Sequence, residues 1–126
     1  MYRCLVVCVA AATLALPAFA QMKREFPQNA LRGRIEFGTP PLIKLNGDVA
    51  RLAPGARIRG TDNMIAMSGG LVGQRFVVNY TVDISGLVRD VWVLRDEELK
   101  VRPWPVTPEQ AQTWAFDPAA QTWTRR

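Results

Sequence analysis

The sequence predicts a mainly β protein: a small antiparallel barrel or sandwich of five to seven short strands, with a short C-terminal helix and a cleaved N-terminal signal peptide. Three observations support this. From residue 31 to about residue 94, short apolar runs alternate with turn signals at regular intervals. No segment there sustains the 3.6-residue apolar period of an amphipathic helix. The first twenty residues follow the order that is typical of a secretory signal.

The N-terminal segment begins with Arg3, continues as an apolar run from Cys4 to Leu16 and ends in Ala18-Phe19-Ala20. The run is shorter than the roughly 20 residues that a membrane-spanning helix needs. Cys8 follows a leucine by three residues, as in lipoproteins, but almost no apolar segment precedes it, so lipidation is the minor alternative. We therefore expect residues 1–20 to be a signal peptide, cleaved before Gln21, and the protein to be periplasmic or secreted.

The composition argues against catalysis. The chain has no histidine, and both of its cysteines, Cys4 and Cys8, would leave with the signal peptide. Without these residues the mature chain lacks the usual general base and the usual zinc ligands. A serine nucleophile would also lack its usual partner. We expect no enzyme, no cofactor and no metal site. After signal cleavage, 15 basic and 11 acidic residues leave a net charge of about +4. Dispersed arginines on the strand faces would keep the domain soluble, and the charge also suits an acidic partner or an anionic membrane surface, whereas export argues against nucleic acid.

Before the strands, residues 21–30 are mixed in character and contain Pro27, so they are expected to form a flexible lead-in. A β domain is expected over residues 31–102. Its strands are expected at Arg32–Phe37, Leu42–Leu45, Val49–Leu52, Ala56–Arg59, Met64–Met67, Gln74–Val82 and Leu87–Leu94. Asn46-Gly47 predicts a tight hairpin, because both residues accept a positive φ cheaply. Pro54-Gly55 and Ser68-Gly69-Gly70 predict breaks in the chain.

The last two strands form the longest expected hairpin, around Asp83-Ile84-Ser85-Gly86. Pairing Val82 with Leu87 places Tyr80 opposite Arg89, Val78 opposite Val91 and Phe76 opposite Val93. One face of the hairpin is then largely apolar and is the better core candidate. The other face is half polar and sets Asn79 opposite Asp90 and Val77 opposite Trp92.

A tail rich in proline and tryptophan is expected over residues 103–126. Thr107-Pro108-Glu109-Gln110 combines a capping residue, a proline at the first helical position and a glutamine at the third, so a short helix is expected near 108–115. Trp104, Trp114 and Trp123 crowd this tail. They either pack over the half-polar barrel face beside Trp92 or form an aromatic contact for a partner, with Trp123 the most exposed of the three.

A second set of candidates consists of arginines on the expected strands. Arg57, Arg59 and Arg75, together with Trp92, would contact an anionic ligand through charge and aromatic surface. The acidic run Asp96-Glu97-Glu98 lacks the alternating ligand spacing of a calcium site.

Several turn and hairpin motifs resemble those of a group of small exported proteins of proteobacteria to which no function is assigned. They are Leu45-Asn46-Gly47, the run from Arg51 to Arg59, Val78-Asn79-Tyr80-Thr81, and Gly86-Leu87-Val88 through Trp92-Val93-Leu94. The resemblance covers about residues 31–98. It implies export and a β-rich domain, and it carries over no functional residues.

Two functions follow as expectations. The first is an exported, non-catalytic binding or adaptor module of the bacterial envelope, without a transmembrane segment after signal cleavage. The alternative is a small barrel that binds a sugar or an anionic small molecule through arginine and aromatic residues. A filled interior with an exposed tail tryptophan would favour the adaptor. A hollow lined by arginine and aromatic rings would favour the ligand binder, and a buried, paired Asp90 beside a lysine would favour an enzyme.

Overall fold

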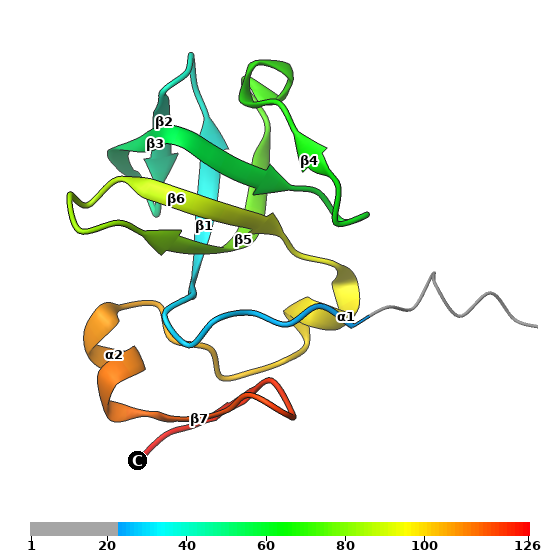
Figure 1. Cartoon of the computed structure of the whole chain (residues 1–126), viewed down its shortest axis with the longest axis vertical. Coiled ribbons are helices and arrows are strands. Elements are labelled where there is room, and N and C mark those ends of the chain that lie inside the picture. The colour runs from blue at the N-terminus through cyan, green and yellow to red at the C-terminus, as the bar shows by residue number, and fades with distance from the viewer. Residues whose placement is uncertain (1–22) are drawn as a thin grey trace, which may run out of the picture.

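A closed five-stranded β-barrel forms the upper part of the molecule (Figure 1). The computed structural model describes residues 23–126, so the expected signal peptide lies outside the described residues. Around the barrel the strands follow the order β2-β1-β5-β6-β3, and β3 pairs again with β2 to close it. All neighbouring pairs are antiparallel except β3 and β6, which run parallel. The sequence therefore predicts the mainly β fold and the small barrel correctly.

The barrel strands follow the turn signals of the sequence. Their bounds are Leu31–Phe37 for β1, Leu42–Leu45 for β2, Asp48–Arg59 for β3, Arg75–Val82 for β5 and Val88–Val93 for β6. A short edge strand, β4 (Ile65–Ala66), adds to β3, and a single 3-10 turn, η2 (Ser68–Leu71), follows it. Asn46 and Gly47 have φ angles of 55° and 88°, and Leu45 pairs with Asp48, as the expected hairpin requires.

One expected turn is part of a strand instead. Pro54-Gly55 was expected to separate two strands, yet β3 is continuous through it. Gly55 has a φ of 77°, and the pairing of β3 with β6 shifts register between Leu52 and Arg57. The two residues therefore make a bulge, which increases the local bend and lets one strand follow the curve of the barrel.

The register expected for the last hairpin is wrong by two residues. Tyr80 lies opposite Val91 and Val78 opposite Val93, whereas Asn79 lies opposite Trp92. The cause is the turn, in which Asp83 hydrogen-bonds to Leu87 through the backbone and Gly86 has a positive φ of 82°. A further irregularity follows at Thr81 and Val82. The even-numbered shift preserves the side-chain alternation over Val78 to Tyr80, which stay on their expected faces. Beyond the irregularity, Val88 is buried in the core, and Arg89, which was expected on the core face, is exposed.

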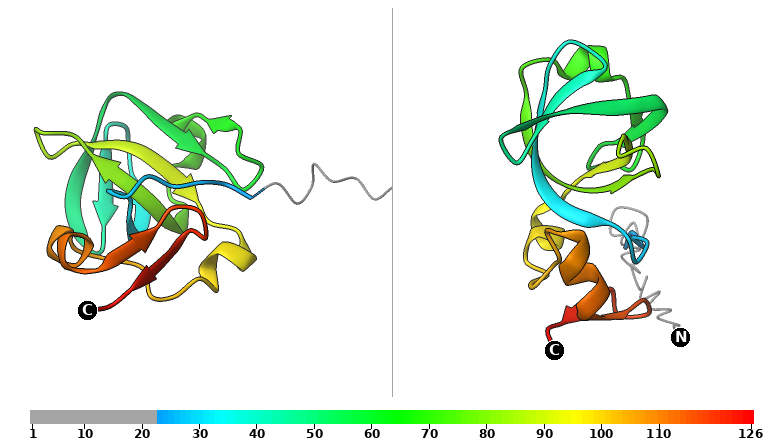
Figure 2. Two further views of the ribbon diagram at one scale, coloured as in Figure 1. Left: turned by 60° about the horizontal axis from the view of Figure 1, so that its bottom comes forward. Right: turned by 90° about the vertical axis from the view of Figure 1, so that its left-hand side faces the viewer.

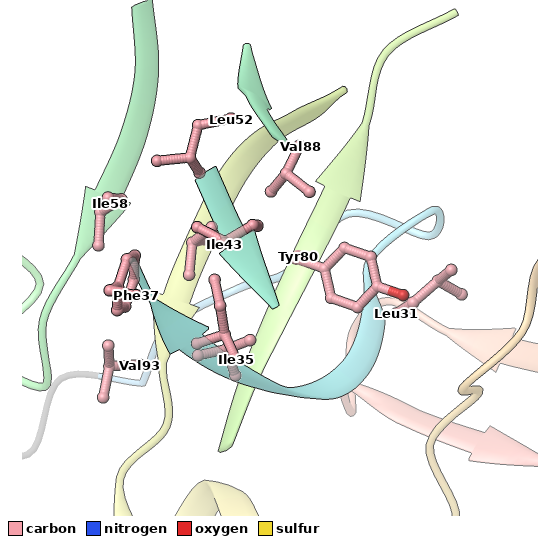
Figure 3. Packing of buried hydrophobic residues seen from close by; sticks show 11 residues of the cluster. Leu31, Ile35, Phe37, Ile43, Leu52, Ile58, Tyr80, Val88 and Val93 are labelled. Atoms are coloured by element: carbon pink, nitrogen blue, oxygen red, sulfur yellow. The ribbon is translucent and has the colours of Figure 1, made fainter. Parts of the chain in front are cut away.

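The barrel interior is filled with aliphatic and aromatic side chains (Figure 3). It contains Leu31, Ile35, Phe37, Ile43, Leu52, Ile58, Val78, Tyr80, Val88, Val91 and Val93. Every barrel strand contributes at least one of them. The interior is therefore a packed core, and a ligand site has to lie on the outside of the barrel.

A second layer lies against the outside of β5 and β6, below the barrel in Figure 1. Residues 95–126, here called the C-terminal layer, contain the helices α1 (Asp96–Leu99) and α2 (Pro108–Thr113) and the strands β7 (Ala115–Asp117) and β8 (Thr122–Thr124). The expected helix is present as α2, with Thr107 and Gln110 forming its capping box. The short helix α1 and the β7–β8 hairpin were not expected.

Most of the expected lead-in packs against the rest of the chain. Residues 23–30, here called the N-terminal strap, run between the barrel and the C-terminal layer (Figure 1, Figure 2). Phe26 and Ala30 are buried in a second apolar cluster with Trp92, Leu94, Trp104 and Trp123. Residues 23–30 carry few apolar side chains, so hydropathy could not reveal this packing. Within residues 23–126, the helices are too short or too polar to cross a membrane.

Candidate functional site

The seam between the barrel, the strap and the C-terminal layer holds a cluster of cationic side chains. Arg24 from the strap is buried at its centre. Its guanidinium donates to the Glu98 carboxylate, through Nε at 2.9 Å and also through Nη2. It also donates to the carbonyls of Gly60 at 2.9 Å and Val93 at 2.8 Å. Arg24 thus links the strap to β6, to the loop after β3 and to α1.

The Glu98 carboxylate is held ionised by these contacts. Burial alone would raise its pKa, but hydrogen bonds from Arg24 and from the backbone N–H of Arg95, together with the charges of both arginines, lower it. Glu98 also caps the start of α1, because its side chain accepts from the Arg95 backbone N–H at 2.8 Å. One carboxylate therefore both closes the seam and starts the helix.

Arg32, on β1, faces the same seam. Its Nη1 donates to the carbonyl of Val101 at 2.7 Å, and its guanidinium lies 5.2 Å from the ring centre of Trp104. Burial, and then the nearby charge of Arg102, lower the pKa of Arg32 to about 10, against an opposing effect of Glu98. The side chain remains charged at neutral pH. Its protein partners are mainly carbonyls and a ring, which leave its charge largely uncompensated.

Two hollows open along this seam. The inner hollow has a volume of about 210 Å³ and the outer hollow about 650 Å³. They share a wall made of Lys23, Arg24 and Arg95. The inner hollow is completed by Phe26, Arg32, Glu97, Glu98, Val101, Trp104 and Gln121. The outer hollow is completed by Glu25, Arg59, Asp62, Asn63 and Trp92.

Both hollows carry more positive than negative charge. Four cationic side chains and two carboxylates line each of them. Three of these cations are shared, so the two hollows together hold five cations and four carboxylates, of which Arg24 and Glu98 form a pair. In the outer hollow, Arg59 lies 5.8 Å from the ring centre of Trp92. The seam therefore presents guanidinium and ammonium groups beside apolar ring edges, which suits a ligand with acidic groups on an apolar frame.

The three arginines that the sequence analysis proposed as ligand contacts lie in different hollows. Arg59 and Trp92 meet at the outer hollow. Arg57 lies elsewhere, in a hollow with Arg89 and Asp90. Arg75 lies in another, where its Nε is 3.5 Å from the Glu36 carboxylate. The proposed ligand contacts therefore lie at three separate sites, and only the one formed by Arg59 and Trp92 belongs to the seam.

The tail tryptophans are positioned mainly as packing residues. Trp104 is buried and donates from Nε1 to the carbonyl of Ala30 at 3.0 Å. Trp123 is only 3% exposed, so the expectation that it is the most exposed of the three is wrong. It packs against Phe116 across the β7–β8 hairpin, with ring centres 4.7 Å apart. Trp114 is half-buried under Arg125, and a partner contact through it stays a prediction.

Asp90 and the acidic run Asp96-Glu97-Glu98 make contacts within the protein. Asp90 is half-buried and accepts from the Thr81 hydroxyl at 3.1 Å; it does not face Asn79 as expected. Among residues 23–126, no group of three or more histidine, cysteine or acidic side chains is placed to hold a metal ion. Glu98, from the acidic run, forms an ion pair with Arg24.

Sequence reasoning missed the seam because its key residues come from three distant segments. Lys23 and Arg24 lie in the expected lead-in, whereas Arg95 and Glu98 lie about 70 positions later in the chain. The one available signal was that Arg24 and Phe26 alternate with Lys23, Glu25 and Pro27, which matches their burial between exposed neighbours. Over so few residues that pattern carries little weight.

Comparison with known proteins finds no counterpart for this chain: no protein-family model, no curated protein and no solved structure matches it.

Proposed function

We propose that this protein is an exported, non-catalytic binding module that holds a small anionic ligand in the seam between its barrel and its C-terminal layer. The observation that carries the proposal is the half-buried Arg32, which lines the inner hollow beside the Trp104 ring. The guanidinium of Arg32 has no carboxylate among its hydrogen-bond partners, which are Asn79 and two backbone carbonyls. A carboxylate or phosphate on a ligand would supply the missing negative charge.

The strand order supports a binding role at the level of architecture. An order of β1-β2-β3-β6-β5 around the barrel, with β3 and β6 parallel, is that of the OB barrel, a Greek-key fold that hosts many binding functions. In such barrels, oligonucleotides and oligosaccharides often lie on the face of the second and third strands. Here residues 42–59, which include both strands, contain no aromatic residue for a ring to stack on. We therefore place the ligand in the seam and not on that face.

The adaptor hypothesis is less well supported. It depended on an exposed tail tryptophan, and Trp104 and Trp123 are both buried. A non-catalytic role is supported by the absence of histidine from the chain. Export still depends on the residues that precede Lys23, and the resemblance to small exported proteins of proteobacteria stays a prediction.

Isothermal titration of the purified protein tests the proposal. D-galacturonate and D-galactose share a sugar frame and differ by one carboxylate. We expect galacturonate to bind, galactose to bind much more weakly, and added salt to reduce the difference. Lys23→Gln should weaken galacturonate binding at least about tenfold, because a hydrogen bond to a charged group contributes about 1.5–3 kcal/mol.

Arg75→Gln is the matched control, because Arg75 is an exposed barrel arginine in a different hollow. It should bind galacturonate as the unchanged protein does. Equal binding of the acid and the neutral sugar, or no binding of either, would contradict the proposal.

A further inference from the structure

The inner hollow has the size of one small ring. Its volume of about 210 Å³ lies below the roughly 300–1,000 Å³ of pockets that hold drug-sized ligands. A cavity of about 150 Å³ is enough to hold a benzene ring. The volume of the inner hollow therefore suits one six-membered ring with one small substituent.

The wall of the inner hollow combines apolar side chains with guanidinium groups. Phe26 and Trp104 are buried in the second apolar cluster, and Val101 packs against that cluster. Arg24 lies 5.7 Å from the ring centre of Phe26, and Arg32 lies 5.2 Å from that of Trp104. A guanidinium attracts the face of an aromatic ring. A ligand ring held among these side chains would therefore gain cation–π attraction in addition to the burial of its apolar surface.

Arg32 has donors to spare for an acidic group. Its guanidinium donates to Asn79 Oδ1 at 3.4 Å, to the Val101 carbonyl at 2.7 Å and to the Glu98 carbonyl at 3.2 Å. A guanidinium carries five N–H groups, so two of them find no acceptor within residues 23–126. Two N–H donors are what one planar carboxylate needs for a charge-assisted contact.

Acceptors for sugar hydroxyls are scarce in the inner hollow. Gln121 is the only side chain with an amide or hydroxyl among the described residues that line it. Its Oε1 accepts from the Phe26 N–H at 2.8 Å, and its Nε2 donates to a backbone carbonyl at 3.0 Å. Glu98 is paired with Arg24, which leaves Glu97 as the remaining carboxylate. A ligand with many hydroxyls would leave most of them to water, whereas a hydrocarbon ring has none to satisfy.

Resting on the proposed function, we infer that the ligand of the inner hollow is an aromatic carboxylate with a single ring. Arg32 binds its carboxylate, and its ring lies among Phe26, Val101 and Trp104. An aliphatic acid of the same size would fill the hollow without the attraction between ring and guanidinium. A sugar acid carries the same charge on a frame whose hydroxyls the hollow does not match.

Isothermal titration of the purified protein with four probes tests the inference. Benzoate carries both the charge and the aromatic ring, benzamide the ring alone, cyclohexanecarboxylate the charge on an aliphatic ring, and D-galacturonate the charge on a sugar frame. We expect benzoate to bind at least about tenfold more tightly than benzamide and galacturonate, and about threefold more tightly than cyclohexanecarboxylate. A tenfold gain is about 1.4 kcal/mol, which corresponds to about 55 Å² of apolar surface removed from water.

Two variants test the location of the ligand. Arg32→Lys keeps a positive charge and loses the planar fork, so it should weaken benzoate binding at least about fivefold. Arg34→Lys, two positions later on β1 and in a different hollow, is its control and should bind benzoate unchanged. Val101→Phe adds volume to the wall of the inner hollow and should weaken benzoate binding at least about tenfold, whereas Val106→Phe, at an exposed position, should not. The comparison of the four probes uses the unchanged protein and does not depend on the folding of any variant.

The outcomes distinguish the inference from the proposed function. If galacturonate binds and benzoate binds no more tightly, the inference is wrong while the proposed function stands. If cyclohexanecarboxylate binds as tightly as benzoate, the aromatic ring is wrong. If benzamide binds as tightly as benzoate, or if neither benzoate nor galacturonate binds, both proposals are wrong. Benzoate binding that Arg32→Lys and Val101→Phe both leave unchanged would place the ligand outside the inner hollow.

Discussion

The buried contact between Arg24 and Glu98 gives the sharpest prediction about stability. Their side chains are 4% and 12% exposed, and Arg24 also satisfies the carbonyls of Gly60 and Val93. Replacing Arg24 with methionine keeps most of the volume and removes every one of these hydrogen bonds. It also leaves a partly buried carboxylate without its partner. Breaking a buried pair in this way costs about 3–5 kcal/mol.

The cost is measurable by denaturant unfolding. We expect Arg24→Met to lower the free energy of unfolding by about 3–5 kcal/mol with an unchanged m-value. In the double variant Arg24→Met/Glu98→Gln the uncompensated charge is gone, so part of the loss should be recovered. Arg34→Met, at an exposed position on β1, is the control and should change stability by less than about 0.5 kcal/mol.

The pH dependence follows from the lowered pKa of Glu98. A carboxylate with a lower pKa in the folded protein than in the unfolded chain stabilises the fold above its unfolded pKa, and this contribution is lost as the pH falls through the folded pKa. Wild type should therefore lose more stability between pH 7 and pH 3 than Glu98→Gln does. A loss under about 1 kcal/mol for Arg24→Met, or equal acid sensitivity of both proteins, would refute the reasoning.

Two further predictions test the packing and the turn. Trp123→Ala should lower the free energy of unfolding by about 3–5 kcal/mol, because it removes a ring from the second apolar cluster. Trp114→Ala, at a half-buried position, should lower it clearly less. Equal losses of stability for the two variants in chemical denaturation would contradict the burial of Trp123. Gly47→Ala should lower the free energy of unfolding by about 1–2 kcal/mol, because Gly47 has a φ of 88° that an alanine adopts only with strain, although there is open space around it. Gly69→Ala, also in open space but without a positive φ, should leave thermal unfolding nearly unchanged. An unchanged stability of Gly47→Ala would show that the hairpin does not need this turn.

Local chemistry made much of the barrel predictable. Leu42–Leu45 and the Asn46-Gly47 turn follow from short-range signals, because a two-residue turn with positive φ angles sets the pairing of its flanks. The capping box of Thr107 and Gln110 likewise located α2. Side-chain alternation identified the buried face of β5 and β6 even though the register was two residues off.

What could not be predicted depends on contacts between distant segments. Closure of the barrel by the parallel pairing of β3 and β6 leaves no local pattern in the sequence. The packing of the strap has no local signal because the hydrogen-bond partners of Arg24 and Phe26 lie between 36 and 95 positions away. The seam is built from such partners, so only Arg59 and Trp92 of its residues were named in advance as contacts for a ligand. Their charge and aromatic character are visible in the sequence, but their contact is not.

An NMR titration of the labelled protein with D-galacturonate tests the central claim most directly. The side-chain N–H signals of Arg32, Arg59 and Arg95 and the indole signals of Trp92 and Trp104 should shift together as ligand is added. The signals of Arg57, Arg75 and Trp114, which lie outside the seam hollows, should stay in place. Shifts confined to β2 and β3, or a spectrum that does not change, would contradict a ligand site in the seam.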